Sequence, residues 1–438
     1  MTVARQRTRG VLLGSTSMLG ARVFSVLASL ISVGILTRAL GREEFGLWSI
    51  IGTFVGFAGS FDFGLGQGLR NRLAAAVAQQ PRDNGAEAQL FFSVLAFLTF
   101  IALVLASVLG GLALMVPWAT FLGVHAPALA GPAQAASVAV IVLLALNLPL
   151  SLNVAGFLAY QDAARRGLLD VLQSAALLIG VVVLARALPI ATFIGAYYVL
   201  FDGAALVSLI VFLRLRGWRV PYLHLKPILT VVREIAAPSA LFWLLGIGAV
   251  ALFTTDPLIA ARLIGIGAAG DFSIVQKIAA LLIGMHFTIL TPLWSAYTHA
   301  AVTGDWRWIR RSFQRSVTVT VVLFGCGGGL AILLHGPLLK LWTGRELTDV
   351  PLMVALAVWA MLYALVNCCS VLLNGLGIIG TQLIAVCLGA LVHVPLSLAL
   401  GQRFGVIGVL YGTIAVVVPI LAATAWRAHR VLRAAPRD

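Results

Sequence analysis

Six ionisable side chains interrupt long apolar runs of the sequence, and their chemistry is the starting point. They are Arg22, Asp62, Asp202, Asp256, Lys277 and His286. A charged group inside a bilayer costs roughly 2.5 to 3.5 kcal/mol on insertion scales, so such residues usually face a cavity or a partner. Each of the six is therefore a candidate for binding an ionic ligand, for ion coupling or gating, or for a structural ion pair.

Arg22 and Lys277 are the two candidates for binding an anionic ligand. Arg22 lies about eleven residues into the first apolar run, hence about 17 Å along a helix that rises about 1.5 Å per residue. A guanidinium offers a planar fork of donors that suits phosphate, which favours an anionic lipid headgroup as the ligand. The alternative for Arg22 is a salt bridge to Asp62, and the two pairings are compatible in alternate states.

Asp256 and Lys277 lie at similar depths in two consecutive apolar runs. Adjacent antiparallel helices would bring them together, so a structural ion pair is the favoured interpretation of these two residues. Pro257 follows the carboxylate directly. Because proline removes a backbone donor, we expect it to kink the helix beside Asp256, and such a kink can act as a hinge.

Asp202 and His286 are candidates for ion coupling or gating, as are Asp62 and Asp256. Asp202 has no basic residue near it in the sequence, so it is protonated, binds a coupling cation, or pairs across a helix bundle. His286 follows Asp62 by about half the length of the chain, so the two titratable groups occupy related positions if the chain is duplicated at that spacing. The alternative for His286 is a hydrogen-bonded core residue.

The composition is that of a polytopic membrane protein. The 438 residues are 61% hydrophobic and 10% charged, and the mean hydropathy is +1.03. The net charge of +15 does not indicate nucleic-acid binding, because most basic residues lie in short gaps between apolar runs. The four cysteines all lie in apolar runs, and the sequence contains no Walker motif and no metal-ligand spacing, so neither disulfides, zinc nor ATP hydrolysis is expected.

Twelve membrane-spanning helices must position these residues. A helix needs roughly 20 apolar residues to cross the hydrocarbon core, and we divide the sequence at its charged, Pro-rich and Gly-rich breaks. The resulting spans are 11–39, 45–69, 89–115, 135–160, 167–188, 190–214, 235–262, 269–292, 313–336, 351–375, 380–402 and 404–427. With a cytoplasmic N-terminus, inside segments carry 21 of the 30 Lys and Arg residues and outside segments carry 7. This bias predicts that both termini are cytoplasmic.

A repeated segment divides the chain into halves. The stretch TRALGREEFGLWS at 37–49 has a looser copy, ARLIGIGAAGDFS, at 261–273, and the same spacing joins Asp62 to His286. A unit of six spans ends on the side where it began, so its copy has the same orientation. We therefore predict two parallel six-helix repeats around a central cavity, with bundles at 1–218 and 235–438 and a cytoplasmic linker at 219–234. Each copy is expected to be a hairpin in which glycine ends one helix.

Two further segments allow two interpretations each. The loops 216–219 and 305–311 interleave tryptophan with arginine, which suits either capture of lipid headgroups or simple topology signals. The glycines of 64–68 resemble a phosphate loop only superficially, because they lie in an apolar span without the lysine of such a loop. Close helix packing is the favoured role for these glycines.

The motifs of the first two spans resemble a known family. An arginine in span one, then Arg38-Ala39-Leu40-Gly41, Gly46-Leu47-Trp48-Ser49 and Asp62-Phe63-Gly64-Leu65-Gly66 are similar to polysaccharide-repeat (O-antigen type) flippases of the multidrug, oligosaccharidyl-lipid and polysaccharide exporter superfamily. The resemblance implies a multi-pass protein of the bacterial inner membrane, with two six-helix bundles, that moves an undecaprenyl-diphosphate-linked oligosaccharide from the cytoplasmic to the periplasmic leaflet by alternating access.

The resemblance also implies a proton or sodium gradient as the driving force, no cofactor, and work beside glycosyltransferases, a polymerase and a chain-length regulator. A cation-coupled multidrug or other lipid exporter of the same fold is the alternative, because Asp62, Asp202 and Asp256 suit cationic cargo. A membrane glycan polymerase or ligase is less favoured. Such an enzyme needs a large catalytic loop, whereas the outside gaps here reach only about twenty residues and carry no paired carboxylates or activated nucleophile.

Overall fold

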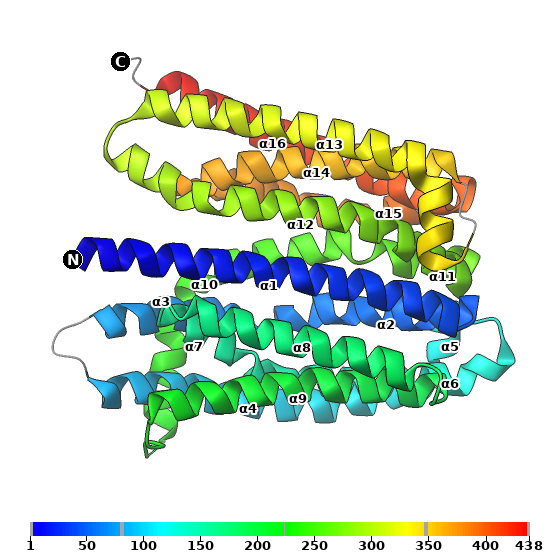
Figure 1. Cartoon of the computed structure of the whole chain (residues 1–438), viewed down its shortest axis with the longest axis horizontal. Helices are drawn as coiled ribbons and strands as arrows, with labels where there is room; N and C mark the ends of the chain where they lie inside the picture. Colours follow the sequence, from blue (N-terminus) through cyan, green and yellow to red (C-terminus); the bar gives the residue numbers. More distant parts are fainter. Residues whose placement is uncertain (1–2, 79–82, 223, 346–348, 436–438) are drawn as a thin grey trace. The chain divides into compact units, whose positions relative to one another are not determined.

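The computed structural model describes residues 3–78, 83–222, 224–345 and 349–435. Within these residues every regular element is a helix, as the all-α prediction requires (Figure 1). The chain divides into two compact units, the first ending at Trp243 and the second beginning at Leu244. The expected linker at 219–234 therefore lies inside the first unit, where Glu234 forms an ion pair of 2.9 Å with Arg72.

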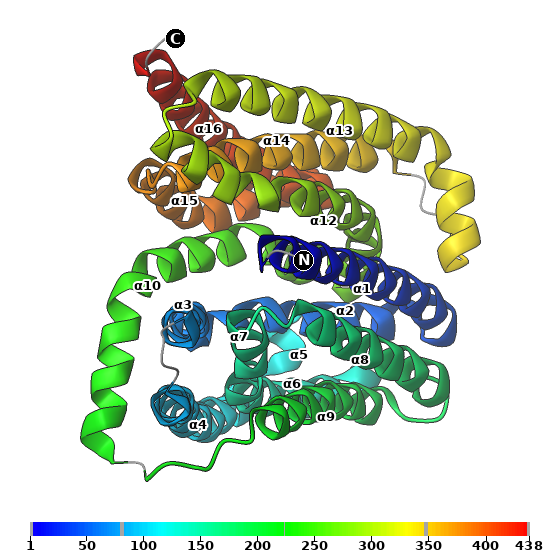
Figure 2. The ribbon, with the colours of Figure 1, turned by 60° about the vertical axis from the view of Figure 1, so that its left-hand side comes forward.

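The first unit consists of long apolar helices joined by short ones. They are α1 (Val3–Ala39), α2 (Arg42–Ala58), η1 (Gly59–Asp62), α3 (Leu65–Ala78), α4 (Asn84–Met115), α5 (Trp118–Phe121), α6 (Pro127–Leu150), α7 (Leu152–Ala159), α8 (Ala163–Leu184), α9 (Ile190–Arg216) and the first part of α10 (Leu225–Phe253). Helix α1 packs along α8, while α6 packs against both α4 and α9 (Figure 2). Phe91, Phe157 and Phe212 fill the core where α4, α7 and α9 meet.

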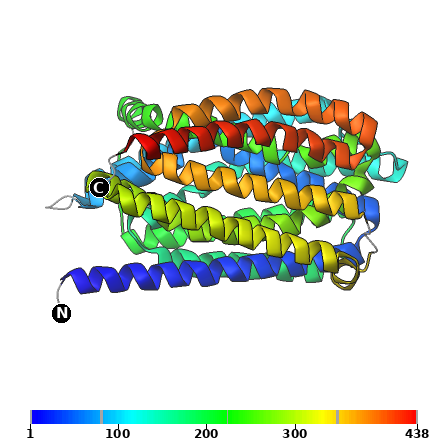
Figure 3. The same cartoon turned by 90° about the horizontal axis from the view of Figure 1, so that it is seen from above.

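The second unit is built in the same manner. Its helices are the rest of α10, then α11 (Asp256–Ile264), α12 (Ile266–Val302), α13 (Trp306–Thr343), α14 (Val350–Gly375), α15 (Gly380–Phe404) and α16 (Val406–Ala434). Helices α13, α14 and α16 run nearly parallel to one another (Figure 3), and α14 packs against α12, α13 and α16. Tyr297, Ile309 and Leu372 belong to the buried core at one end of this bundle.

Helices α15 and α16 approach closely through small residues. A Cβ atom added to Gly412 of α16 would lie 2.3 Å from Oγ of Ser397 and 2.6 Å from its Cα, and one added to Gly408 would lie 2.1 Å from the carbonyl oxygen of Leu400. Only glycine lets the two backbones meet at these points. Small residues serve helix packing in membranes in this way, because lipid tails give no hydrophobic drive for helices to associate.

Eleven described helices are long and apolar enough to cross a membrane. The second predicted span, 45–69, is not among them, because it is interrupted: α2 ends at Ala58, the 3-10 turn η1 follows, and α3 begins at Leu65. The prediction of one continuous helix over 45–69 is therefore wrong. The backbone reverses its handedness at Phe63, with φ of 52°, and at Gly64, with φ of 75°, and no α-helix continues through such residues.

The repeated segment forms the predicted hairpin in both units. Gly41 separates α1 from α2, and Gly265 separates α11 from α12. In each copy the residue four positions later, Phe45 or Ala269, donates its backbone N–H to the glycine carbonyl, at 2.9 and 3.3 Å. Gly265 has a φ of 118°, which a residue with a side chain rarely adopts. The two turns thus share a backbone hydrogen bond, whereas of the two glycines only Gly265 has a positive φ.

The predicted break beside Pro257 is present. Helix α10 ends at Phe253 and α11 begins at Asp256, with Pro257 in its first turn. The hydroxyls of Thr254 and Thr255 bond back to the carbonyls of Val250 and Ala251, which satisfies two acceptors at the end of α10. The Val250 carbonyl also keeps its backbone bond from the N–H of Thr254, whereas the Ala251 carbonyl accepts its bond at the helix end from the hydroxyl of Thr255.

Candidate functional site

The titratable residues singled out in the sequence lie in separate polar clusters within the two units. Three acidic groups have well-defined partners, and in two of them the partner differs from the one expected. Among the described residues no three His, Cys, Asp or Glu side chains converge closely enough to hold a metal ion.

Arg22 lies on α1 beside α8. The two helices are joined by a hydrogen bond of 2.8 Å between the hydroxyls of Ser25 and Ser174, which lie one turn beyond Arg22 and Asp170, respectively. Arg22 is exposed, interacts electrostatically with Asp170, and has no direct ion pair with a described residue. The guanidinium is therefore available to a ligand, while Asp170 moderates its charge.

A second arginine extends this cluster and was not singled out from the sequence. Arg166 of α8 is only 9% exposed, and it donates hydrogen bonds to Asp170 on the next turn and to Asn153 of α7. One carboxylate thus lies near two arginines, which leaves a net positive charge at this point of α1 and α8. The spacing of Arg166 and Asp170, four residues apart on one helix face, was the signal that could have identified the pair.

Asp62 does not pair with Arg22, so the salt-bridge alternative is not found among the described residues. Its two carboxylate oxygens instead accept hydrogen bonds from the backbone N–H groups of Gly64 and Gly66, at 2.8 and 3.3 Å. These amides begin α3, so Asp62 caps the helix that follows the break. The Asp-Phe-Gly-Leu-Gly motif is thus a helix start inside an apolar segment, and irregular backbone at such depth is tolerated only where protein or a cavity surrounds it.

Asp202 is buried in the first unit and is 9% exposed. Asn147 of α6 donates a hydrogen bond of 2.8 Å to one carboxylate oxygen of Asp202, whereas the other oxygen has no hydrogen-bond partner among the described residues. A neutral amide compensates a buried carboxylate only in part. The carboxylate oxygen without a partner in the described part of the chain can therefore accept a proton or a cation.

Asp256 pairs with His393 rather than with Lys277, so the predicted ion pair of α11 and α12 is wrong. One carboxylate oxygen of Asp256 lies 3.0 Å from Nε2 of His393, and the other accepts a hydrogen bond of 2.7 Å from the hydroxyl of Thr413. Lys277 is exposed on α12 and has no ion pair with a described residue. The sequence did not predict the face of the helix on which each of these residues lies.

The Asp256 cluster forms a relay of polar groups with no access to solvent. His393 Nε2 lies 3.0 Å from the hydroxyl oxygen of Thr413, which in turn donates to Asp256, and the three residues are 0 to 1% exposed. On the far side of the ring, Nδ1 lies 3.3 Å from the hydroxyl of Thr255. A proton can pass between imidazole and carboxylate through Thr413, beside the break that separates α10 from α11.

Neither His393 nor Thr413 was singled out from the sequence, although a histidine in the apolar span 380–402 is a signal of the same kind as His286.

His286 is a hydrogen-bonded core residue in α12, as the alternative interpretation stated. Its Nε2 lies 2.7 Å from the hydroxyl of Thr320, which donates to the carbonyl of Ser316, and its ring meets that of Phe324 edge to face. His286 is the counterpart of Asp62 in the repeat, yet it lies within a continuous helix whereas Asp62 caps a break. The repeat therefore preserves the hairpin but not the role of this position.

The comparisons place this architecture among known transporters. A multidrug resistance MATE family transporter of the MOP superfamily, in an inward-facing conformation, is similar with a TM-score of 0.68 and 18% identity over 97% of this chain and 100% of that chain. The lipid II flippase MurJ, in an inward closed conformation, is similar with a TM-score of 0.73 and 12% identity over 95% of this chain and 87% of that chain. At these identities the similarity concerns the fold alone.

A third solved structure is a MOP superfamily transporter from Pyrococcus furiosus Vc1, with a TM-score of 0.66 and 14% identity over 98% of this chain and 96% of that chain. No curated protein is similar enough in sequence to count as a match. The family model for polysaccharide biosynthesis proteins matches residues 11–296, which is more than half of the chain. The protein is therefore a multi-pass membrane protein with a MOP-type transporter fold, and it belongs to the polysaccharide biosynthesis protein family.

Proposed function

We propose that the protein is a flippase that moves an undecaprenyl-diphosphate-linked oligosaccharide, such as an O-antigen or exopolysaccharide repeat unit, from the cytoplasmic to the periplasmic leaflet of a bacterial inner membrane. Transport by alternating access, without a covalent step, agrees with the MOP-type fold and the family match. Glycosyltransferases that supply the substrate, and a polymerase with its chain-length regulator that consume it, would be the partners.

The observation that carries the proposal is the exposed guanidinium of Arg22 beside the Arg166 and Asp170 pair. Helix α1 has 37 residues and is about 55 Å long at about 1.5 Å per residue, more than the roughly 30 Å of a hydrocarbon core. Counted back from its end at Ala39, Arg22 lies about 26 Å along the helix. In the predicted orientation this is near the cytoplasmic boundary, where the diphosphate of a lipid-linked sugar would first arrive.

The driving force in this proposal is an ion gradient acting on buried acids. Asp256 with His393 suits proton coupling, because an imidazole and a carboxylate joined through Thr413 exchange a proton without exposing a charge to lipid. Asp202 with Asn147 suits a proton or a cation such as sodium, because one of its carboxylate oxygens has no partner among the described residues. Lys277, exposed on α12, is a second candidate contact for the phosphates.

Reconstitution in liposomes tests the flippase function. A fluorescent lipid-linked oligosaccharide is added, and its transfer between leaflets is scored with a membrane-impermeant quencher. Loss of a charge-assisted hydrogen bond costs about 1.5 to 3 kcal/mol, so Arg22→Ala should lower transport about ten- to a hundredfold. Arg22→Lys should retain part of the activity. Arg403→Ala, which removes an exposed arginine at the end of α15, is the matched control. Equal transport by Arg22→Ala and Arg403→Ala would contradict the role of Arg22.

A cation-coupled multidrug exporter is the second candidate, and the observation that favours it is the pair of buried acids, Asp202 and Asp256. Acidic groups in a transport path attract cationic drugs, whereas exposed basic groups repel them. A deletion strain separates the two functions. Loss of a surface polysaccharide with unchanged resistance to cationic dyes supports the flippase, and hypersensitivity to the dyes with normal polysaccharide supports the exporter.

A further inference from the structure

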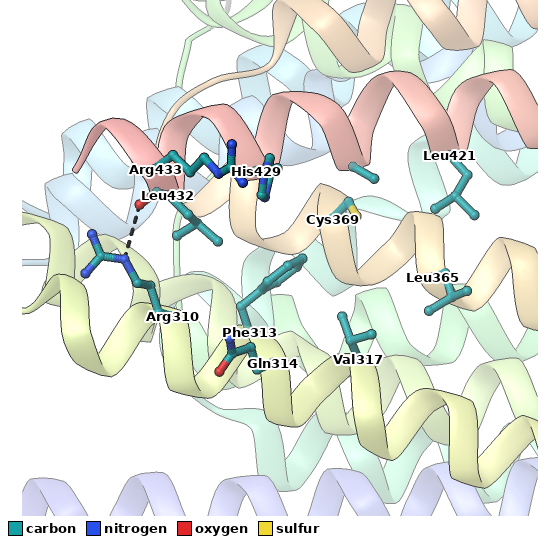
Figure 4. Close-up of a pocket in the computed structure, with 11 residues that line it drawn as sticks. Arg310, Phe313, Gln314, Val317, Leu365, Cys369, Leu421, His429, Leu432 and Arg433 are labelled. Carbon is teal, nitrogen blue, oxygen red and sulfur yellow. Dashed lines mark hydrogen bonds between the residues drawn. The ribbon is translucent and has the colours of Figure 1, made fainter. Parts of the chain in front are cut away.

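A cleft within the second unit has the form of a lipid site and plays no part in the proposed transport. It lies between α13 and α16, with α14 as its floor, and it has a volume of about 810 Å³ (Figure 4). Ligand pockets in proteins usually have volumes of about 300 to 1,000 Å³. The side chains that line it are Arg310, Phe313, Gln314, Val317, Leu365, Cys369, Leu421, Ala425, His429, Leu432 and Arg433.

The polarity of the cleft changes along its length. On α16 the lining runs from Leu421 to Arg433, twelve residues or about 18 Å of helix. At one end of the cleft lie Arg433 and His429 of α16 and Arg310 of α13, whereas the other end is lined by apolar side chains such as Leu421 and Val317 (Figure 4). This is the charge distribution of a site for a molecule with an anionic head and an apolar tail.

Two hydrogen bonds join α13 to the C-terminal end of α16 at the basic end of the cleft. Nε of Arg310 donates to the carbonyl of Leu432 at 3.1 Å, and a terminal nitrogen donates to the carbonyl of Ala435 at 2.8 Å. The side chain of one helix thus satisfies acceptors at the C-terminus of the other, which carries the negative end of a helix dipole. Arg310 therefore fixes the spacing of α13 and α16 at the mouth, while the exposed Arg433 and His429 are available to a ligand.

Exposed tryptophans near the basic end of the cleft indicate that this end lies at the membrane surface. Trp308 on α13 is 37% exposed and Trp426 on α16 is 55% exposed, and Arg430 stacks on Trp426 at 5.0 Å. Tryptophan gathers at the level of lipid headgroups, with arginine beside it. The basic end of the cleft is then at the depth of phosphate groups, and its apolar end lies at the depth of acyl chains.

We propose that this cleft binds one anionic phospholipid of the surrounding bilayer, with its phosphate at Arg433 and His429 and one acyl chain between α13 and α16. Charge complementarity at the mouth selects an anionic over a zwitterionic headgroup. The cleft lies wholly within the second unit, so the site does not depend on the transport proposed for Arg22. In this proposal the interleaved tryptophans and arginines of 305–311 help to form a lipid site, in addition to serving as topology signals.

Native mass spectrometry of the detergent-purified full chain, titrated in parallel with phosphatidylglycerol, phosphatidylethanolamine and undecaprenyl phosphate, tests the proposal. We expect one phosphatidylglycerol to bind at least about fivefold more tightly than phosphatidylethanolamine, since each basic residue near an anionic group contributes about 1 kcal/mol. The double variant Arg433→Ala and His429→Ala should weaken phosphatidylglycerol about tenfold or more. Arg430→Ala, which changes a neighbouring exposed arginine outside the cleft, should not.

A further variant tests lipid binding in the cleft without changing the charge of its mouth. Ala425→Phe fills the apolar part of the cleft without altering its mouth, so it should also abolish the tight phosphatidylglycerol event. Equal binding by wild type and both cleft variants would overturn the proposal, as would equal affinity for the two phospholipids. Tighter binding of undecaprenyl phosphate than of phosphatidylglycerol, lost in the same variants, would overturn it in favour of a substrate site.

Discussion

Replacing Thr413 by valine should destabilise the second unit more than the loss of one hydroxyl ordinarily does. The two side chains have nearly equal volume, so the change creates almost no cavity, but it removes the donor to Asp256 at 2.7 Å and the contact with His393 at 3.0 Å. Hydrogen bonds between helices in membranes average about 0.6 kcal/mol, whereas those to charged groups contribute about 1.5 to 3. Because Asp256 is 1% exposed and no water can replace the hydroxyl, we expect about 2 to 3 kcal/mol.

The assay is reversible unfolding in mixed micelles titrated with SDS, followed by tryptophan fluorescence. Thr424→Val is the matched control, since Thr424 lies on the same helix, is equally buried, and bonds to the carbonyls of Ile420 and Leu421. It should cost less than about 1 kcal/mol. Combining Thr413→Val with Asp256→Asn should cost at least about 1 kcal/mol less than the sum of the single changes, because the carboxylate that lost its partner is gone. Additive effects, or equal effects at the two threonines, would refute the relay.

Three other changes have expected outcomes. Gly412→Ala places a methyl group 2.3 Å from Oγ of Ser397 and should cost about 3 kcal/mol or yield no folded protein on size-exclusion chromatography, whereas Gly329→Ala, with open space around it, should be tolerated. Phe63→Gly should be about 1 kcal/mol more stable than Phe63→Ala in the same SDS titration, because both variants lose the ring contact with Trp243 but only glycine relieves the left-handed φ of 52°; equal stability would contradict this account of the strain. Asp202→Asn should abolish the dependence of transport on an ion gradient while leaving lipid-linked substrate binding unchanged, and retained coupling in proteoliposomes would remove Asp202 from that role.

The sequence was most informative about position along each helix. The constant spacing of the repeated segment predicted that Gly41 and Gly265 would form equivalent turns, and the two turns share the same backbone hydrogen bond. Apolar runs and their breaks predicted eleven of the twelve spans as long apolar segments, although the fourth is divided at Ser151 into α6 and α7 and the seventh at the expected break beside Pro257. These features depend only on neighbouring residues and on hydropathy, which can be read without knowing how helices pack.

The direction in which a side chain points could not be predicted in the same way. Asp256 and Lys277 were assigned similar depths, yet the rotation of their helices turns Asp256 toward His393, which is far away in the chain. That rotation depends on the packing of α11 against α15 and α16, and apolarity on all sides of a membrane helix gives no amphipathic stripe to reveal it. The break at Asp62 was missed for a related reason, since apolar residues such as Phe61, Phe63 and Leu65 maintain high hydropathy through it.

The twelve-span prediction requires α2 and α3 to form one crossing together, and a crossing made of two short helices would enter the bilayer differently from the eleven long apolar segments described above. The insertion machinery sorts a nascent segment by its own length and apolarity, and about twenty residues are needed. Helix α2 has 17 residues and α3 has 14, so neither qualifies alone. Contacts of α2 with α6 and of α3 with α7 provide the stabilisation that the short apolar length of each helix does not. We expect this crossing to become committed only after ribosomes have synthesised α7, so the second crossing would be inserted after the third and fourth rather than in the order of the chain.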